Sequence, residues 1–143
     1  MAFKIFLDAN VILDFTLQRN VGYDNAKKIV QSVIDGKFNA YITPAIVHIA
    51  GYYLTRAYEA ETAKKILLAL LADITTIDIP HSITLHALRS SMMDIEDALQ
   101  YYSAQYHDLD YFVSRDKPLL NFNGKDKLPV IHPKDFVNQF IVS

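Results

Sequence analysis

The chain has 143 residues, of which 51% are hydrophobic, and this suits one domain built around a single core. A formal net charge of −2 excludes an overall basic field for nucleic acid, and the absence of cysteine excludes disulfides and thiolate metal sites. Any metal must therefore be bound by oxygen or imidazole. No apolar run is long enough to cross a bilayer and no secretory signal is visible, so we expect one cytoplasmic domain over residues 1–143, away from membranes.

Short apolar strands alternate with amphipathic helices along the chain. We predict strands near residues 3, 38, 75, 109 and 129. Helical periodicity predicts helices near Val11, after Pro44, and over residues 23–34, 59–73, 82–90, 95–106 and 133–140, whereas 117–125 has the composition of a loop. This order implies right-handed crossovers and an α/β fold: a three-layer α/β/α sandwich around a mainly parallel five-stranded sheet.

The first predicted strand ends at an acid. Ile5-Phe6-Leu7 is an apolar run that stops at Asp8, which would lie at the carboxyl edge of the sheet, where open parallel sheets bind ligands. Asp8 is equally suited to be the N-cap of the helix that follows. Asn10 and Asp14 come soon after it, and Asp14 can order the first loop instead of binding metal.

Two further acids are expected at the same edge. Asp116 leaves the predicted strand 109–114, and Asp97 lies near the start of helix 95–106, off its predicted buried stripe of Ile95, Ala98, Leu99, Tyr102 and Tyr106. Crowded carboxylates repel one another, so they either raise a pKa or bind a divalent cation, and oxygen ligands favour Mg²⁺ or Mn²⁺. The plainer alternatives are a helix-dipole role for Asp97 and a turn role for Asp116 before Lys117-Pro118.

Other catalytic patterns are missing. Four glycines, at positions 22, 36, 51 and 124, are too scattered for a phosphate-binding loop or a dinucleotide fingerprint. The sequence also lacks the G-x-S-x-G and H-E-x-x-H patterns of serine hydrolases and zinc proteases. Carboxylate chemistry is what remains.

Four segments resemble the PIN-domain family of metal-dependent nucleases, particularly VapC-like toxins. They are residues 6–14 (FLDANVILD), 94–98 (DIEDA), 110–116 (DYFVSRD) and 129–136 (PVIHPKDF). The resemblance implies that Asp8, Asp97 and Asp116 bind Mg²⁺ or Mn²⁺, that Asn10, Glu96 and Ser114 support them, and that the protein is an endoribonuclease hydrolysing RNA. It also implies a small antitoxin partner and a homodimer.

One position departs from this family. His48 stands where most active members carry a glutamate, and histidine suits Mg²⁺ poorly. Tyr52 and Arg56 share a helix face with His48, and Arg56 can help to receive a phosphate backbone. The alternative is therefore a catalytically degenerate PIN domain that binds nucleic acid or protein. A phosphatase-like hydrolase ranks third, because position 10 is asparagine where a second acid would be needed.

Overall fold

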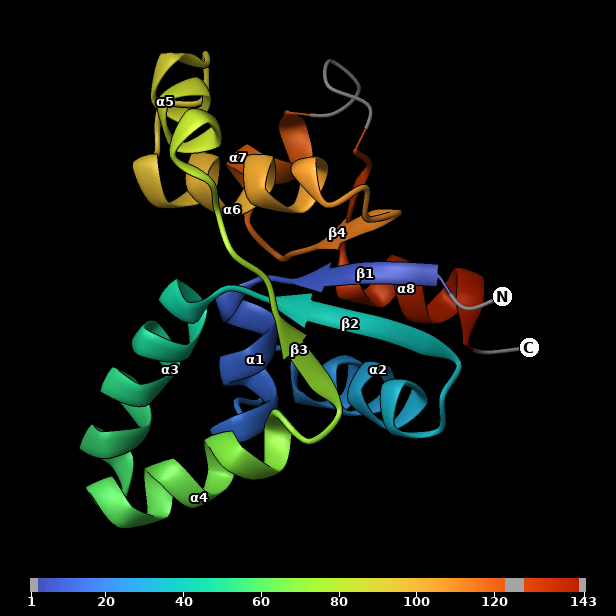
Figure 1. Ribbon diagram of the computed structural model, residues 1–143. Coiled ribbons are helices and arrows are strands. Elements are labelled where there is room, and N and C mark those ends of the chain that lie inside the picture. The colour runs from blue at the N-terminus through green and yellow to red at the C-terminus, as the bar shows by residue number, and fades with distance from the viewer. Residues whose placement is uncertain (1–2, 123–127, 142–143) are drawn as a thin grey trace.

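Five parallel strands form the central sheet of the computed structural model, which describes residues 3–122 and 128–141. Their order across the sheet is β3-β2-β1-β4-β5 (Figure 1). The strands are β1 (Phe3–Leu7), β2 (Phe38–Ile42), β3 (Ile74–Thr76), β4 (Tyr111–Val113) and β5 (Val130–Ile131). All paired strands run parallel, which confirms the predicted five-stranded sheet.

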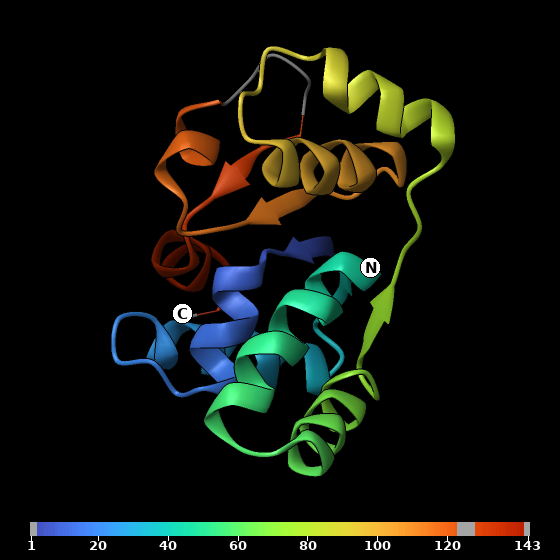
Figure 2. The same cartoon turned by 90° about the vertical axis from the view of Figure 1, so that its left-hand side faces the viewer.

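Helices cover both faces of this sheet, and Figure 2 shows the resulting layers, with α5 and α6 on one side and α1 to α4 on the other. They are α1 (Ala9–Thr16), α2 (Tyr23–Ile34), α3 (Pro44–Ala57), α4 (Ala60–Leu70), α5 (His81–Arg89), α6 (Ile95–Tyr106), α7 (Lys117–Asn121) and α8 (Pro133–Phe140). The predicted α/β/α sandwich is thus confirmed. No helix within the described residues is both long and apolar enough to span a membrane.

Aromatic residues of the two inner strands form the centre of the core. Phe6 of β1 and Phe112 of β4 are fully buried, and their rings stack with centroids 4.8 Å apart. Tyr101 of α6 packs against Phe112, and its hydroxyl donates a hydrogen bond of 2.9 Å to the carbonyl oxygen of Leu128. Large apolar residues buried on adjacent parallel strands fix the register of β1 and β4, and this register positions the site described below.

The buried face of α6 differs from the predicted stripe. Ile95 and Tyr106 are 63% and 51% exposed, although Ala98 and Tyr102 are buried as expected. Two polar residues, Gln100 and Ser103, are buried instead, because Thr43 Oγ1 donates to Gln100 Oε1 at 2.5 Å and Ser103 Oγ donates to the carbonyl oxygen of Asp78. Hydrogen-bond partners outside the helix make this burial possible, and hydrophobic periodicity does not reveal them.

The segment after β4 also differs from the prediction. Residues Lys117–Asn121 form the short helix α7 where a loop is expected from the sequence. Asp116 occupies its N-cap position and Pro118 lies in its first turn, where a proline costs no hydrogen bond. The predicted loop residues 123–125 lie outside the described part of the chain.

Candidate active site

The pairing of β1 with β4 brings the first acid and a serine together. Leu7 is in register with Val113, so Asp8 and Ser114 follow neighbouring strands at the carboxyl edge of the sheet. Ser114 Oγ donates to Asp8 Oδ2 at 2.7 Å, and the Ala9 amide donates to Asp8 Oδ1 at 2.8 Å. Asp8 is 4% exposed. It is therefore the N-cap of α1 and also a buried acid at the expected edge.

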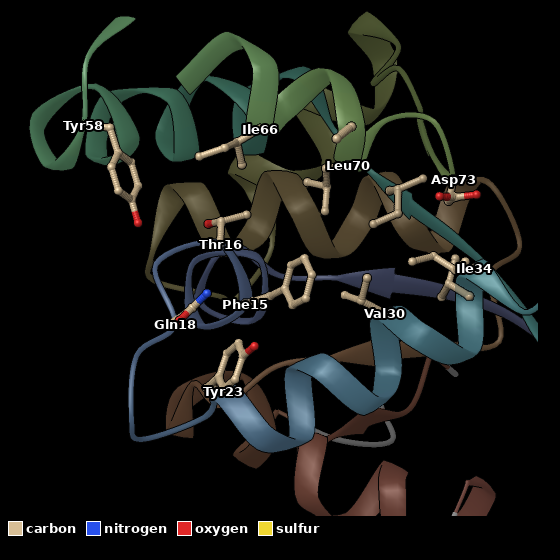
Figure 3. Close-up of a pocket in the computed structure, with 13 residues that line it drawn as sticks. Phe15, Thr16, Gln18, Tyr23, Val30, Ile34, Tyr58, Ile66, Leu70 and Asp73 are labelled. Carbon is tan, nitrogen blue, oxygen red and sulfur yellow. The ribbon is translucent and has the colours of Figure 1, made fainter. Parts of the chain in front are cut away.

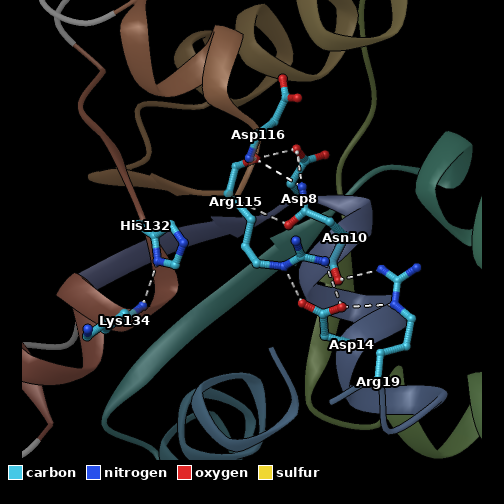
Figure 4. A network of polar contacts seen from close by, with 9 residues as sticks. Asp8, Asn10, Asp14, Arg19, Arg115, Asp116, His132 and Lys134 are labelled. Carbon is cyan, nitrogen blue, oxygen red and sulfur yellow. Dashed lines mark hydrogen bonds and ion pairs between the residues drawn. The ribbon is translucent and has the colours of Figure 1, made fainter. Parts of the chain in front are cut away.

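Asn10 connects the two strands further. Its Nδ2 lies 3.3 Å from Asp8 Oδ2 and 3.1 Å from Ser114 Oγ, and its Oδ1 accepts a hydrogen bond of 3.1 Å from the Arg115 amide (Figure 4). The Asp116 amide donates to Ser114 Oγ at 3.0 Å. These bonds hold the backbone of residues 114–116 against the start of α1. The structure thus places Asn10 and Ser114 in direct contact with Asp8.

Four acids gather at this edge, and we call Asp8, Glu96, Asp97 and Asp116 the acid cluster. Burial raises the pKa of Asp8 to about 6, outweighing its hydrogen bonds from Ser114 and Ala9, and the charges of Glu96 and Asp116 raise it further. Asp8 is therefore harder to ionise than an exposed aspartate, because desolvation disfavours the charged form.

Asp97 and Glu96 reach the acid cluster from the first turn of α6. Burial raises the pKa of Asp97, and its hydrogen bond with Asp116 and the charges of Asp116, Asp94 and Asp8 act in the same direction. Burial followed by the charges of Asp94 and Asp116 also raises the pKa of Glu96. Asp94 itself is the N-cap of α6, since its Oδ1 accepts from the Asp97 amide at 2.9 Å. The charged forms of these acids therefore repel one another.

Asp116 carries the clearest sign of a missing partner. Its Oδ2 is buried, and within the described residues it has no hydrogen-bond partner. A buried carboxylate oxygen without a hydrogen-bond donor destabilises the fold, and such an oxygen is a good ligand for a hard divalent cation. The donor set of the acid cluster therefore fits Mg²⁺ or Mn²⁺. No three His, Asp or Glu side chains in the described ranges are already arranged around a common metal position, so these acids would have to move closer together on binding.

Asp14 lies outside the acid cluster because two arginines pair with it. Its carboxylate is 1% exposed and accepts hydrogen bonds of 2.9 Å from Arg19 Nε, 2.6 Å from Arg115 Nε and 2.9 Å from Arg115 Nη2. Figure 4 shows the two guanidinium groups approaching Asp14 from two sides. Sequence reasoning assigned no site role to Arg19 or Arg115. A buried acid in the apolar helix α1 could have indicated them, since such an acid needs a cation.

His48 lies apart from these contacts. It is exposed on α3, and within the described residues no hydrogen bond or ion pair joins it to an acid. Together with Tyr52, Arg56 and Lys64 it lines a groove of about 520 Å³ between α3 and α4. Arg56 Nη1 donates to Tyr52 Oη at 2.9 Å, and its Cζ lies 5.4 Å from the Tyr52 ring centroid. The shared helix face predicted for His48, Tyr52 and Arg56 is thus present, but no contact links it to the acid cluster.

A second cavity, also of about 520 Å³, is apolar and lies among α1, α2, α4 and β3 (Figure 3). Phe15, Tyr23, Tyr58, Ile66 and Leu70 are among its lining residues, and Asp73 lies at its edge. None of the acid-cluster residues lines it. Its surface suits apolar side chains better than phosphate chemistry.

Two solved structures share this fold. One is the VapBC2 of Rickettsia felis bound to a DNA fragment from their promoter, with 12% identity, a TM-score of 0.64, and coverage of 91% of this chain and 98% of that chain. The other is PAE2754 from Pyrobaculum aerophilum, with 18% identity, a TM-score of 0.66, and 97% of each chain covered. At these identities the likeness shows the fold alone. No curated protein matches the sequence.

The family comparison is more specific, because it covers most of the chain. The PIN domain family matches residues 4–118, a range that contains Asp8 after β1, Asp97 in the first turn of α6, and Ser114 and Asp116 after β4. PIN domains are in general nucleases. The chain belongs to the PIN domain family.

Proposed function

We propose that this protein is a metal-dependent endoribonuclease that hydrolyses RNA phosphodiester bonds. The observation that carries the proposal is the buried, unpartnered Oδ2 of Asp116 beside Asp97 and Asp8, two acids whose pKa values are raised. Asp8, Asp97 and Asp116 would hold Mg²⁺ or Mn²⁺, and Glu96 would support them. When bound, a divalent cation supplies Lewis acidity to the phosphate and lowers the pKa of water.

The other residues of the site prepare Asp8 for this task. Ser114 and Asn10 both bond to Asp8 Oδ2, so the carboxylate has a fixed orientation before any ligand arrives. Asn10 and Ser114 are held in turn by the amides of Arg115 and Asp116. These residues are positioning groups in the proposal, because both hold the carboxylate of Asp8.

The test is cleavage of a mixed structured RNA pool in Mn²⁺, Mg²⁺ or EDTA by the wild type, Asp8→Asn and Asp97→Asn. A matched control is Asp135→Asn, which removes an exposed acid from the first turn of α8, the position that the half-buried Asp97 has in α6. We expect metal-dependent cleavage that is lost in both site variants and kept in the control. Equal cleavage by all four proteins would identify a contaminating nuclease and refute the proposal.

A second candidate function is a catalytically degenerate PIN domain that binds nucleic acid or protein. It is favoured by His48, an exposed residue with no contact to the acid cluster where a glutamate is expected, and by the lack of three preassembled metal-binding side chains within the described residues. His48→Glu separates the two candidates. If His48→Glu increases metal-dependent cleavage, the wild type is an enzyme with a weakened site. If neither the wild type nor His48→Glu cleaves RNA, the binding module is supported.

We further propose an antitoxin-type protein partner, a homodimer and a cytoplasmic site of action. The partner is suggested by the similarity to VapBC2 of Rickettsia felis, a complex crystallised with promoter DNA. Light scattering coupled to gel filtration measures the oligomeric state directly, and a monomeric mass at micromolar concentration would refute the homodimer.

A further inference from the structure

Arg19, Asp14 and Arg115, which we call the arginine clamp, carry one net positive charge. Two guanidinium groups, which stay protonated in proteins, share one buried carboxylate. Salt bridges of 2.9 and 2.6 Å hold Arg19 and Arg115 to Asp14. A structural ion pair needs only one cation for each acid, so the second arginine is surplus to the neutralisation of Asp14.

Both arginines keep hydrogen-bond donors that no residue of the described ranges accepts from. Each guanidinium has five N–H donors. Arg115 uses Nε and Nη2 on Asp14, and Arg19 uses Nε on Asp14 and Nη2 on the Asn10 carbonyl oxygen. Within the described residues, Nη1 of neither arginine makes a hydrogen bond. The two side chains are 39% and 25% exposed, so these remaining donors can reach a ligand from solvent.

The arginine clamp is rigidly joined to the acid cluster. The Arg115 amide donates to Asn10 Oδ1, and Asn10 Nδ2 lies 3.3 Å from Asp8 Oδ2. Asn10 therefore bridges the arginine clamp and the acid cluster. On the other side, a Cβ at Gly22 would lie 2.0 Å from Asp14 Oδ2 and 3.2 Å from Arg115 Nε. The loop between α1 and α2 is therefore packed onto the arginine clamp. Groups held in this way lose little conformational entropy when they bind a ligand.

We propose that the arginine clamp binds a phosphate group of the RNA strand, adjacent to the phosphodiester that is presented to the acid cluster. The inference rests on the proposed function. The acid cluster repels phosphate, so a polyanionic substrate needs a nearby cationic contact to approach it. Planar guanidinium donors match phosphate oxygens, and a fixed pair of them would set the register of the strand relative to Asp8.

The first experiment follows the arginine Nε–H signals of the full-length protein by NMR during titration with inorganic phosphate in EDTA. We expect the signals of Arg19 and Arg115 to move with a common saturation curve, and those of Arg56 and Arg89, the other arginines of the chain, to stay in place. Unmoved signals for Arg19 and Arg115, or equal movement of all four, would overturn the inference.

The second experiment measures binding of a short single-stranded RNA in EDTA by fluorescence anisotropy at several salt concentrations. Arg19→Gln should weaken binding about tenfold and reduce the slope of log K against log salt by about 0.7, the value for one lost single-strand phosphate contact. Arg19→Lys should restore most of that slope, because it keeps the charge. The control is Arg89→Gln, which removes an exposed arginine from α5 and should leave RNA binding unchanged.

Two results separate this inference from the proposed function. The first is that the protein cleaves RNA with manganese, while a folded Arg19→Gln variant keeps the wild-type RNA affinity and salt slope. This result would refute the arginine clamp as a phosphate site and would leave the nuclease proposal intact. Phosphate-induced movement of the Arg19 and Arg115 signals in a protein that cleaves no RNA would support the site and refute the nuclease. A merely structural role predicts a lower melting temperature for Arg19→Gln with no change in RNA affinity.

Discussion

The substitution Asp8→Asn should stabilise the metal-free protein at alkaline pH. Burial raises the pKa of Asp8 from 3.8 to about 6, so the native state holds a proton that the unfolded chain has released. Stability from this group is fully present below pH 3.8 and is lost as the pH rises through 6. At 1.36 kcal/mol for each pKa unit, the full loss is about 3 kcal/mol, of which about 1.4 kcal/mol falls between roughly pH 5 and pH 8.

Asparagine cannot ionise, so the variant escapes this loss. It does give up hydrogen bonds, because its amide nitrogen replaces Asp8 Oδ2, which accepts from both Ser114 Oγ and Asn10 Nδ2, and this costs about 1 kcal/mol for each bond at every pH. The change in ΔΔG between the two pH values therefore isolates the charge. Urea unfolding of both proteins in EDTA at about pH 5 and pH 8 should show the variant gaining about 1.4 kcal/mol on the wild type as the pH rises. A ΔΔG that does not vary with pH would refute the argument from burial.

The same experiment extends to metal. Millimolar Mn²⁺ at about pH 8 should stabilise the wild type, by about 2.7 kcal/mol if its concentration is 100 times the dissociation constant, and should leave Asp8→Asn almost unchanged. Equal stabilisation of the two proteins would show that the cation binds elsewhere.

Two further predictions concern the arginine clamp and the acid cluster. Gly22→Ala should lower the free energy of unfolding by more than about 2 kcal/mol in denaturant titrations, because its Cβ would lie 2.0 Å from Asp14 Oδ2. Gly51→Ala, whose Cβ would meet only Leu67 Cδ1 at 3.6 Å, should stabilise the helix by up to about 1 kcal/mol, and equal effects of the two changes would contradict the close approach at Gly22. Asp116→Asn should lower the pKa of Asp97, because it removes a like charge, and ¹³C NMR titration of the carboxyl groups measures this directly. An unchanged Asp97 titration would mean that Asp116 does not contribute to the raised pKa of Asp97.

The sheet could be predicted from sequence because its strands are simple. Parallel strands buried on both faces appear as short, nearly continuous apolar runs, and Ile5-Phe6-Leu7 and Phe112-Val113 are such runs, fully buried in the structure. The face of α6 could not be predicted in the same way. Gln100 and Ser103 are buried there because Thr43 and Asp78 supply their hydrogen bonds, and such distant partners leave no periodic signal.

The candidate site was accessible to sequence reasoning only in part. Asp8 and Asp116 each follow a strand, so parallel pairing alone places them at one edge of the sheet. The pairing of Asp14 with Arg115 joins residues 101 positions apart, and neither residue lies in a pattern that names its partner. Side-chain pairing of this kind depends on the final packing of α1 against the loop after β4. Local propensity does not encode it.

The separation in sequence between Asp8 and Ser114 determines when the candidate site can assemble during translation. These two residues are hydrogen-bonded across 106 positions of the chain, and β4, which carries Ser114 to the edge of the sheet, is the fourth of five strands to leave the ribosome. A nascent chain that ends before β4 has Asp8 but lacks the serine that orients it and the acid that follows. For a proposed ribonuclease made beside messenger and ribosomal RNA, this order of synthesis delays assembly of the site until most of the polypeptide has been translated.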